Sequence, residues 1–136
     1  MRYLGLDLGS RTLGVAMSDS LGIIASSHGT IRHNEDYKFL LGEVNKLVNE
    51  NKIETIILGY PKNMNNTVGP KGELSIKFKE ELEKLLDIPV ILQDERLTTK
   101  QATDVLIKGG TSRKNRKKVV DSLAATIILQ SYLDRR

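Results

Sequence analysis

The sequence contains no cysteine among its 136 residues. This absence excludes a disulfide framework, a zinc-thiolate site and thiol catalysis. Long apolar runs are also missing, since no stretch approaches the roughly 20 residues that a membrane helix needs. The beginning of the chain lacks the basic-then-apolar pattern of a signal peptide. We therefore expect a soluble, intracellular protein that does not enter a membrane.

The chain has the length of one ordinary domain, and it shows no repeat, linker or low-complexity stretch. We expect residues 1–136 to form a single domain. Such a chain is too short for two lobes that close on a nucleotide.

Charge is distributed unevenly along the chain. The 21 basic and 17 acidic side chains give a net charge of +4. Residues 1–95 hold 11 basic and 14 acidic side chains, whereas residues 96–136 hold 10 and 3, which is a net charge of +7. This asymmetry favours a polyanionic partner for the C-terminal part, although a solvated lysine-rich helix face would give the same count. Aromatic residues make up only 4%, so recognition by backbone shape is favoured over base stacking.

Apolar spacing predicts five strands and four helices. Residues 2–8, 13–18 and 21–31 follow a strand pattern, the last through Ile23 and Ile24. The first connection is too short for a helical crossover, which predicts antiparallel pairing. A loop is expected at residues 62–72. The remaining elements are expected as helix 36–51, strand 54–60, helix 73–86 with Leu74, Phe78, Leu82, Leu85 and Leu86 facing inward, strand 88–92, helix 98–107 and helix 115–133.

This order predicts an α/β fold with a mixed five-stranded sheet flanked by helices. The first strand lies in the middle, the second and third are antiparallel on one side, and the fourth and fifth are parallel to it on the other. The first, fourth and fifth strands then end at one edge, where open α/β sheets usually bind their ligands.

The stretch "GLDLGSRTLGVAMSD" places Asp7 inside an apolar strand, and a buried acid needs a partner or a cation. Two functional explanations are open. The loop at residues 9–12 could hold the phosphates of a nucleotide, with Asp7 binding the magnesium ion. Alternatively, Asp7 could belong to a carboxylate cluster that binds metal ions for cleavage of a nucleic acid.

Two further acids are candidates for such a cluster. Glu95, in "LQDERLTT", follows the fifth strand, and Asp121, in "KKVVDSLAAT", interrupts an apolar helix face. Carboxylates from three segments repel one another unless a cation compensates. Oxygen ligands without His or Cys suit Mg²⁺ or Mn²⁺, and such ions support phosphodiester hydrolysis. Separate ion pairs, of Asp7 with Arg11 and of Glu95 or Asp121 with Arg96, are the structural alternative.

A basic segment precedes Asp121. Positive charge near a helix start opposes the helix dipole, so a phosphate ligand would account for it. Backbone contacts of this kind give affinity and salt dependence without sequence readout. We expect Arg11 and Arg96 to add to this surface. The segment consists of Arg113, Lys114, Arg116, Lys117 and Lys118.

Four motifs carry a resemblance over practically the whole chain. "GLDLGSRTLGVAMSD", "ILGYPKNMNNT", "DERLTT" and "SRKNRKKVVDSLAATIILQSYLD" resemble, in order and spacing, those of the YqgF family. These small ribonuclease-H-like proteins are described as Holliday-junction-resolvase-like and as nucleases of precursor 16S ribosomal RNA. The chain departs from the usual pattern at Tyr60, where the family has an apolar residue, and at Asn65 and Asn66, which replace Asp-Gly.

The resemblance implies a ribonuclease-H-like nuclease domain with a catalytic and metal-binding site at Asp7, Glu95 and Asp121, and with Mg²⁺ or Mn²⁺ as cofactor. It implies maturation of the 5′ end of precursor 16S ribosomal RNA in the bacterial cytoplasm, with structured RNA as the partner. Cleavage of branched DNA by a homodimer is one alternative. A nucleic-acid-binding factor without catalysis is another.

Overall fold

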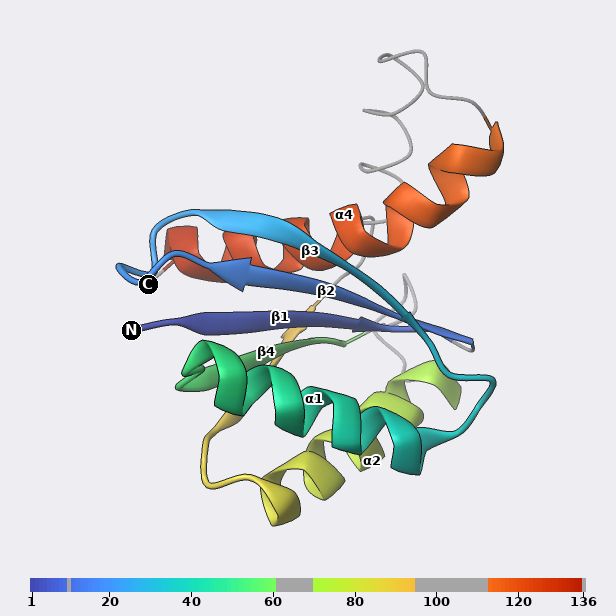
Figure 1. Cartoon of the computed structure of the whole chain (residues 1–136), viewed down its shortest axis with the longest axis horizontal. Coiled ribbons are helices and arrows are strands. Elements are labelled where there is room, and N and C mark those ends of the chain that lie inside the picture. Colours follow the sequence, from blue (N-terminus) through green and yellow to red (C-terminus); the bar gives the residue numbers. More distant parts are fainter. Residues whose placement is uncertain (10, 61–69, 95–112, 136) are drawn as a thin grey trace.

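The computed structural model describes residues 1–9, 11–60, 70–94 and 113–135, without the side chains of residues 70, 71, 94 and 113–122. Within these residues, five strands form one sheet and three helices pack on it (Figure 1). The strands are β1 (Tyr3–Leu8), β2 (Thr12–Ser18), β3 (Ala25–Arg32), β4 (Thr55–Tyr60) and β5 (Val90–Asp94). The helices are α1 (Tyr37–Asn51), α2 (Pro70–Leu85) and α4 (Arg113–Arg135).

The sheet has the strand order β3-β2-β1-β4-β5. β1 pairs antiparallel with β2, and β2 pairs antiparallel with β3. β1 and β4, and β4 and β5, pair in parallel. The predicted mixed sheet, with its central first strand, is confirmed.

Alternation along β1 divides the core into two layers, because successive side chains of a strand point to opposite faces. Leu4, Leu6 and Leu8 belong to the core that α1 and α2 cover. Tyr3 belongs to the second core, which α4 covers with Ala125 and other residues. Figure 1 shows α4 on one side of the sheet and α1 with α2 on the other.

Helix α1 begins and ends as its sequence predicts. The Asp36 side chain caps the helix by accepting a 3.1 Å hydrogen bond from the Phe39 N–H, as is typical of an N-cap acid. Leu40, Val44 and Val48 recur every four residues and are the buried residues of this helix. Lys52 ends the helix in the left-handed conformation, with φ of 53°.

The third strand begins later than predicted. It starts at Ala25, and the side chains of Ile23 and Ile24 are 56% and 60% exposed instead of forming a strand face. The reason lies in Asp19, whose carboxylate accepts hydrogen bonds from the backbone N–H groups of both isoleucines, at 2.7 and 3.2 Å. These bonds fold the segment into a turn, which takes its N–H groups away from strand pairing.

Other bounds also differ from the prediction. Residues 70–72 belong to α2 and not to a loop, because Pro70 occupies the first helical position, where its missing N–H costs nothing. Leu85 is 50% exposed and does not face the core. β5 starts at Val90, and α4 starts at Arg113. The helix predicted at residues 98–107 lies outside the described residues.

Within the described part of the chain, no helix is long and apolar enough to cross a membrane.

Candidate active site

Asp7 lies near the carboxyl end of the central strand. It pairs with Gly14 of β2, and its side chain is half-buried. Tyr3 and Gly5 share its strand face by alternation, and this is the face that α4 covers. The predicted position of Asp7 at the carboxyl edge of the sheet is therefore confirmed, and its side chain faces the same layer as α4.

Helix α4 runs over β1 in a register that the contacts define. The rings of Tyr3 and Tyr132 lie 5.9 Å apart. Two residues further along the strand, a Cβ on Gly5 would lie 2.7 Å from the Leu129 Cβ and 3.1 Å from the Ala125 carbonyl oxygen. Residues nearer the carboxyl end of β1 therefore contact residues nearer the start of α4.

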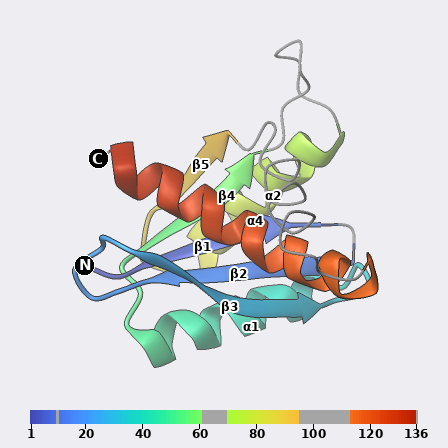
Figure 2. The same ribbon diagram turned by 90° about the horizontal axis from the view of Figure 1, so that it is seen from above.

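This register places position 121 with respect to Asp7. Two strand residues span about 6.6 Å, and one helical turn rises about 5.4 Å. A further step along β1, from Gly5 to Asp7, therefore corresponds to about one turn of α4, from Ala125 back to Asp121. In Figure 2, α4 lies across this face and reaches the carboxyl end of β1.

β5 ends at the same edge of the sheet, and the next residue in the chain is Glu95. β5 ends at Asp94, which pairs with Tyr60, the last residue of β4. Glu95 and Arg96 lie outside the described residues. Within the part of the chain that is described, no cluster of three His, Cys, Asp or Glu residues could hold a metal ion.

The turn after Asp7 is held by a histidine that the sequence patterns did not single out. His33 is 3% exposed, and its Nδ1 accepts a 3.0 Å hydrogen bond from the Glu35 N–H. Nδ1 therefore carries no proton, and the Nε2–H donates to the Gly9 carbonyl oxygen at 3.1 Å. The His33 backbone N–H also donates to the Arg11 carbonyl oxygen at 3.0 Å. No local sequence motif signals this role, because it depends on the register of β2 and β3.

The turn is closed internally as well. The Gly9 N–H donates to the Thr12 carbonyl oxygen at 2.8 Å. A phosphate cradle needs free backbone N–H groups, so this bond removes one donor from the nucleotide-binding alternative. The Arg11 side chain is exposed at this turn.

The predicted basic segment forms the beginning of α4. Residues 113–118 are helical, as the first turn and a half of this element, and their side chains are not described. The segment lies in the same helix as Asp121, and its last residue, Lys118, precedes Asp121 by less than one turn. It thus starts at the end of the sheet where Asp7 lies.

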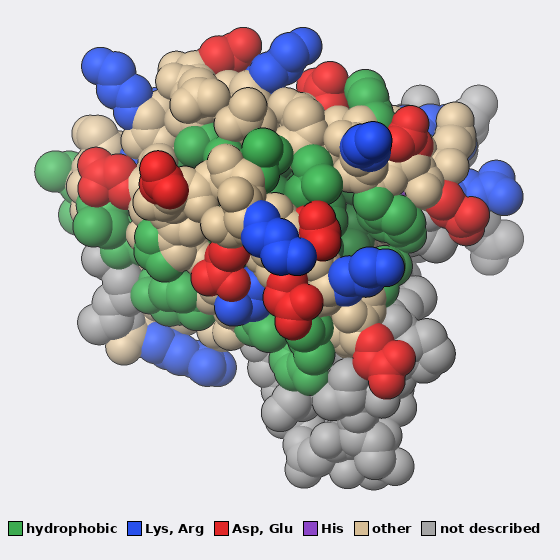
Figure 3. All heavy atoms as spheres, turned by 90° about the horizontal axis from the view of Figure 1, so that it is seen from below, with side chains coloured by type: hydrophobic (Ala, Val, Ile, Leu, Met, Phe, Trp, Pro, Cys, Tyr) green, Lys and Arg blue, Asp and Glu red, His purple; other side chains and the backbone are tan. Residues whose placement is uncertain are grey.

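The face formed by α1 and α2 has a different character. Figure 3 shows acidic and basic side chains interspersed over it. The ion pairs there join Lys46 to Glu43, Lys79 to Glu83 and Lys84 to Glu81, at 4.0, 2.7 and 3.6 Å. A surface of mixed sign offers no continuous track for a polyanion.

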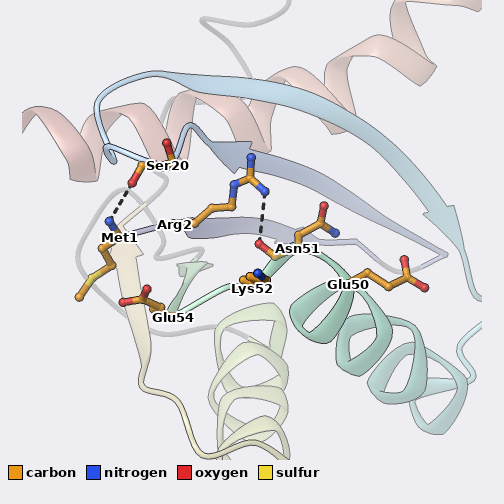
Figure 4. Close-up of a pocket in the computed structure, with 7 residues that line it drawn as sticks. All are labelled: Met1, Arg2, Ser20, Glu50, Asn51, Lys52 and Glu54. Carbon is orange, nitrogen blue, oxygen red and sulfur yellow. Dashed lines mark hydrogen bonds between the residues drawn. The ribbon is translucent and has the colours of Figure 1, made fainter.

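A hollow of about 470 Å³ lies at the amino end of β1, away from Asp7 (Figure 4). The amino group of Met1 donates to the Ser20 carbonyl oxygen at 2.8 Å, and Arg2 Nη1 donates to the Asn51 carbonyl oxygen at 3.3 Å. Its lining includes Lys52 as well as Glu54. The hollow therefore mixes both signs of charge, and it contributes nothing to the candidate site.

Comparison with known proteins places the chain in a family. A family model described as "RuvX: Holliday junction resolvase" matches residues 1–135. A Bacillus subtilis protein named "Putative pre-16S rRNA nuclease" is 51% identical over 135 residues, which are 98% of each chain.

Solved structures share the fold at low identity. RuvC of Thermus thermophilus, in complex with a Holliday junction substrate, has a TM-score of 0.62 at 15% identity. The match covers 99% of this chain and 95% of the RuvC chain. The yeast mitochondrial Holliday junction resolvase Ydc2 has a TM-score of 0.54 at 15% identity, over 96% of this chain and 77% of its own. The predicted ribonuclease-H-like fold is confirmed, and the chain belongs to the RuvX family, which is the YqgF family that its motifs indicate.

Proposed function

We propose that this protein is a metal-dependent endonuclease that matures the 5′ end of precursor 16S ribosomal RNA. The observation that carries the proposal is the register of α4 on β1 at Gly5, from which we infer that position 121 lies level with Asp7. β5 ends at the same edge, directly before Glu95. Three acids from distant segments would then meet where strands of an open α/β sheet present their ligands. The relatives named for precursor 16S ribosomal RNA supply the substrate class.

The carboxylates of Asp7, Glu95 and Asp121 would hold Mg²⁺ or Mn²⁺. The donor set fits these hard cations, which prefer oxygen ligands. The nearby His33 offers no competing nitrogen, because both ring nitrogens already have hydrogen-bond partners. When bound, the ions would supply activation of a water molecule and stabilisation of charge on the phosphate.

The residues of the chain itself would position the substrate. The turn at residues 9–12, held by His33, fixes the end of β1 directly after Asp7. The basic segment, together with Arg11 and Arg96, would bind the sugar-phosphate backbone without reading bases. By analogy with metal-dependent nucleases of this fold, the products would carry a 5′-phosphate and a 3′-hydroxyl.

Branched DNA is the second candidate substrate, and the description of the family favours it. Symmetric resolution of a four-way junction would require a homodimer with two active sites.

We further propose that residues 1–136 act as one nuclease domain in the cytoplasm.

The test compares end-labelled precursor 16S ribosomal RNA with a four-way DNA junction, each incubated with Mn²⁺ or with EDTA. The variants are wild type and Asp7→Asn, with Asp19→Asn as the matched control at the opposite end of the sheet. We expect cleavage of the RNA in Mn²⁺ only, lost in Asp7→Asn and retained in Asp19→Asn. Cleavage of the junction alone would replace RNA with DNA as substrate. Tight binding without cleavage of either would favour the non-catalytic alternative.

A further inference from the structure

Gln93 is a buried polar residue near the candidate site, and the proposed cleavage reaction does not use it. It is the fourth residue of β5, and 7% of its surface is exposed. Among the described residues, its side-chain Nε2 is buried and has no hydrogen-bond partner. A buried amide donor without a partner destabilises the fold, because it loses its hydrogen bonds to water and gains none within the protein. Such a group needs an explanation.

The strand register relates Gln93 to Asp7. Gln93 pairs with Gly59 of β4. Leu6 of β1 pairs with Leu58 of β4, so Gly59 is level with Asp7, one residue further on each strand. Leu6, Leu58 and Leu92 all belong to the core under α1 and α2. Alternation therefore puts Gln93 and Asp7 on the opposite face, the face of α4.

The middle strand carries no side chain at this level. Neighbouring strands lie about 4.8 Å apart, so the backbones at positions 7 and 93 are separated by roughly 10 Å across Gly59. A carboxylate then flanks one side of a bare strip of backbone, and an amide donor flanks the other.

We propose that Gln93 is a substrate-contacting residue, whose Nε2–H donates to a phosphate oxygen of the nucleic-acid strand bound over Asp7. This inference rests on the proposed function, because it uses the same site. An uncharged donor suits this place, since it can bind a phosphate oxygen. A cationic side chain would instead form ion pairs with the carboxylates and compete with the metal ions for them. The Gln93 Nε2, which has no partner among the described residues, then gains one when the substrate is bound.

The test uses Gln93→Met, which keeps the length of the side chain and removes the donor. Affinity for a precursor 16S ribosomal RNA fragment is measured with Ca²⁺ in place of Mn²⁺, so that binding is separated from cleavage. We expect binding about tenfold weaker, as for loss of one hydrogen bond to a charged group. Thermal unfolding should occur at the same or a higher temperature, because a buried donor without a partner has been replaced by an apolar group.

Gln130→Met is the matched control. The Gln130 side chain accepts from the Ala25 N–H at 2.8 Å and donates to the Ile23 carbonyl oxygen at 2.9 Å, at the opposite end of the molecule. This variant should unfold at a lower temperature and bind the RNA like wild type. The two glutamines thus separate a substrate contact from a structural one.

Unchanged RNA binding by Gln93→Met would overturn the inference. Weaker Mn²⁺ binding by the same variant would then mean that Gln93 orients the carboxylates instead. A wild-type protein that binds RNA but cuts neither substrate would refute the proposed nuclease activity, while the binding comparison would still decide the role of Gln93.

Discussion

Gly5 of β1 and Leu129 of α4 approach so closely that a side chain at position 5 would collide with the helix. An added Cβ would lie 2.7 Å from the Leu129 Cβ, a distance that packed carbon atoms do not reach. The absence of a side chain at Gly5 therefore sets how near α4 lies to the central strand. This close approach also fixes the register of α4 on β1, on which the proposed placement of position 121 beside Asp7 rests.

Gly5→Ala should push α4 away from β1. Relief of the overlap by shifting the helix costs about 1–3 kcal/mol in the free energy of unfolding, which denaturant titration measures. Cleavage should fall as well, because the helix carries Asp121.

Gly42→Ala is the control for this change. A Cβ there would meet nothing within 4 Å, and alanine is favoured over glycine inside a helix. This variant should gain about 0.5–1 kcal/mol in the free energy of unfolding. Equal stability of Gly5→Ala and wild type would show that α4 is not held against the strand in this way.

His33→Phe should keep the ring volume and remove the hydrogen bond to the Gly9 carbonyl oxygen. We expect a loss of about 1 kcal/mol in the free energy of unfolding, together with slower cleavage and unchanged RNA affinity. The reason is that the turn after Asp7 loses its anchor while the basic segment is untouched. His28→Phe, at an exposed position of β3, should leave cleavage and affinity unchanged. A fully active His33→Phe would contradict this role.

Acid should loosen the turn between β2 and β3. The hydrogen bond from the backbone N–H of Ile23, aided by that of Ile24, holds the pKa of Asp19 below its usual value of 3.8. A carboxyl group with a lowered pKa stabilises the fold above that value, and the contribution is lost as the pH falls through the lower, folded-state pKa.

Asp19→Asn should therefore reduce the fall in unfolding free energy below pH 3.8. The measurement is denaturant unfolding at a series of acidic pH values. An identical acid dependence of the two proteins would rule out this contribution. The change should have no effect at neutral pH on Mn²⁺ binding, because Asp19 lies at the other end of the sheet.

The basic segment should determine the salt dependence of nucleic-acid binding. Replacing Arg116, Lys117 and Lys118 by Gln should weaken binding of all sequences alike. The slope of the logarithm of affinity against the logarithm of salt concentration should fall by about 1 for each phosphate group that the variant no longer neutralises. Lys46→Gln with Lys84→Gln, on the exposed α1 and α2 face, should leave the slope unchanged. An unchanged slope in the triple variant would remove the segment from the interface.

The order and pairing of the strands could be predicted because periodicity and connection length act locally. The position of Asp7 near the carboxyl end of the central strand could be predicted in the same way. The start of β3 could not be predicted, since Ile23 and Ile24 have strand propensity and only the Asp19 carboxylate folds them into a turn. The His33 contact and the proposed role of Gln93 depend on the residue-by-residue register of neighbouring strands, which the sequence pattern does not encode. The placement of Glu95 and the side-chain geometry of Asp121 stay predictions.

We propose that Asp7 and Asp121 ligate the same metal ions. Titration with Mn²⁺, followed by electron paramagnetic resonance of the free ion, tests it in wild type, Asp7→Asn, Asp121→Asn and the Asp19→Asn control. Loss of a ligating carboxylate should weaken affinity by more than about tenfold, since even outer-shell partners of a metal contribute that much. We predict this loss in Asp7→Asn and in Asp121→Asn, with wild-type affinity in Asp19→Asn. Wild-type Mn²⁺ affinity in Asp7→Asn would show that Asp7 does not ligate the metal ions.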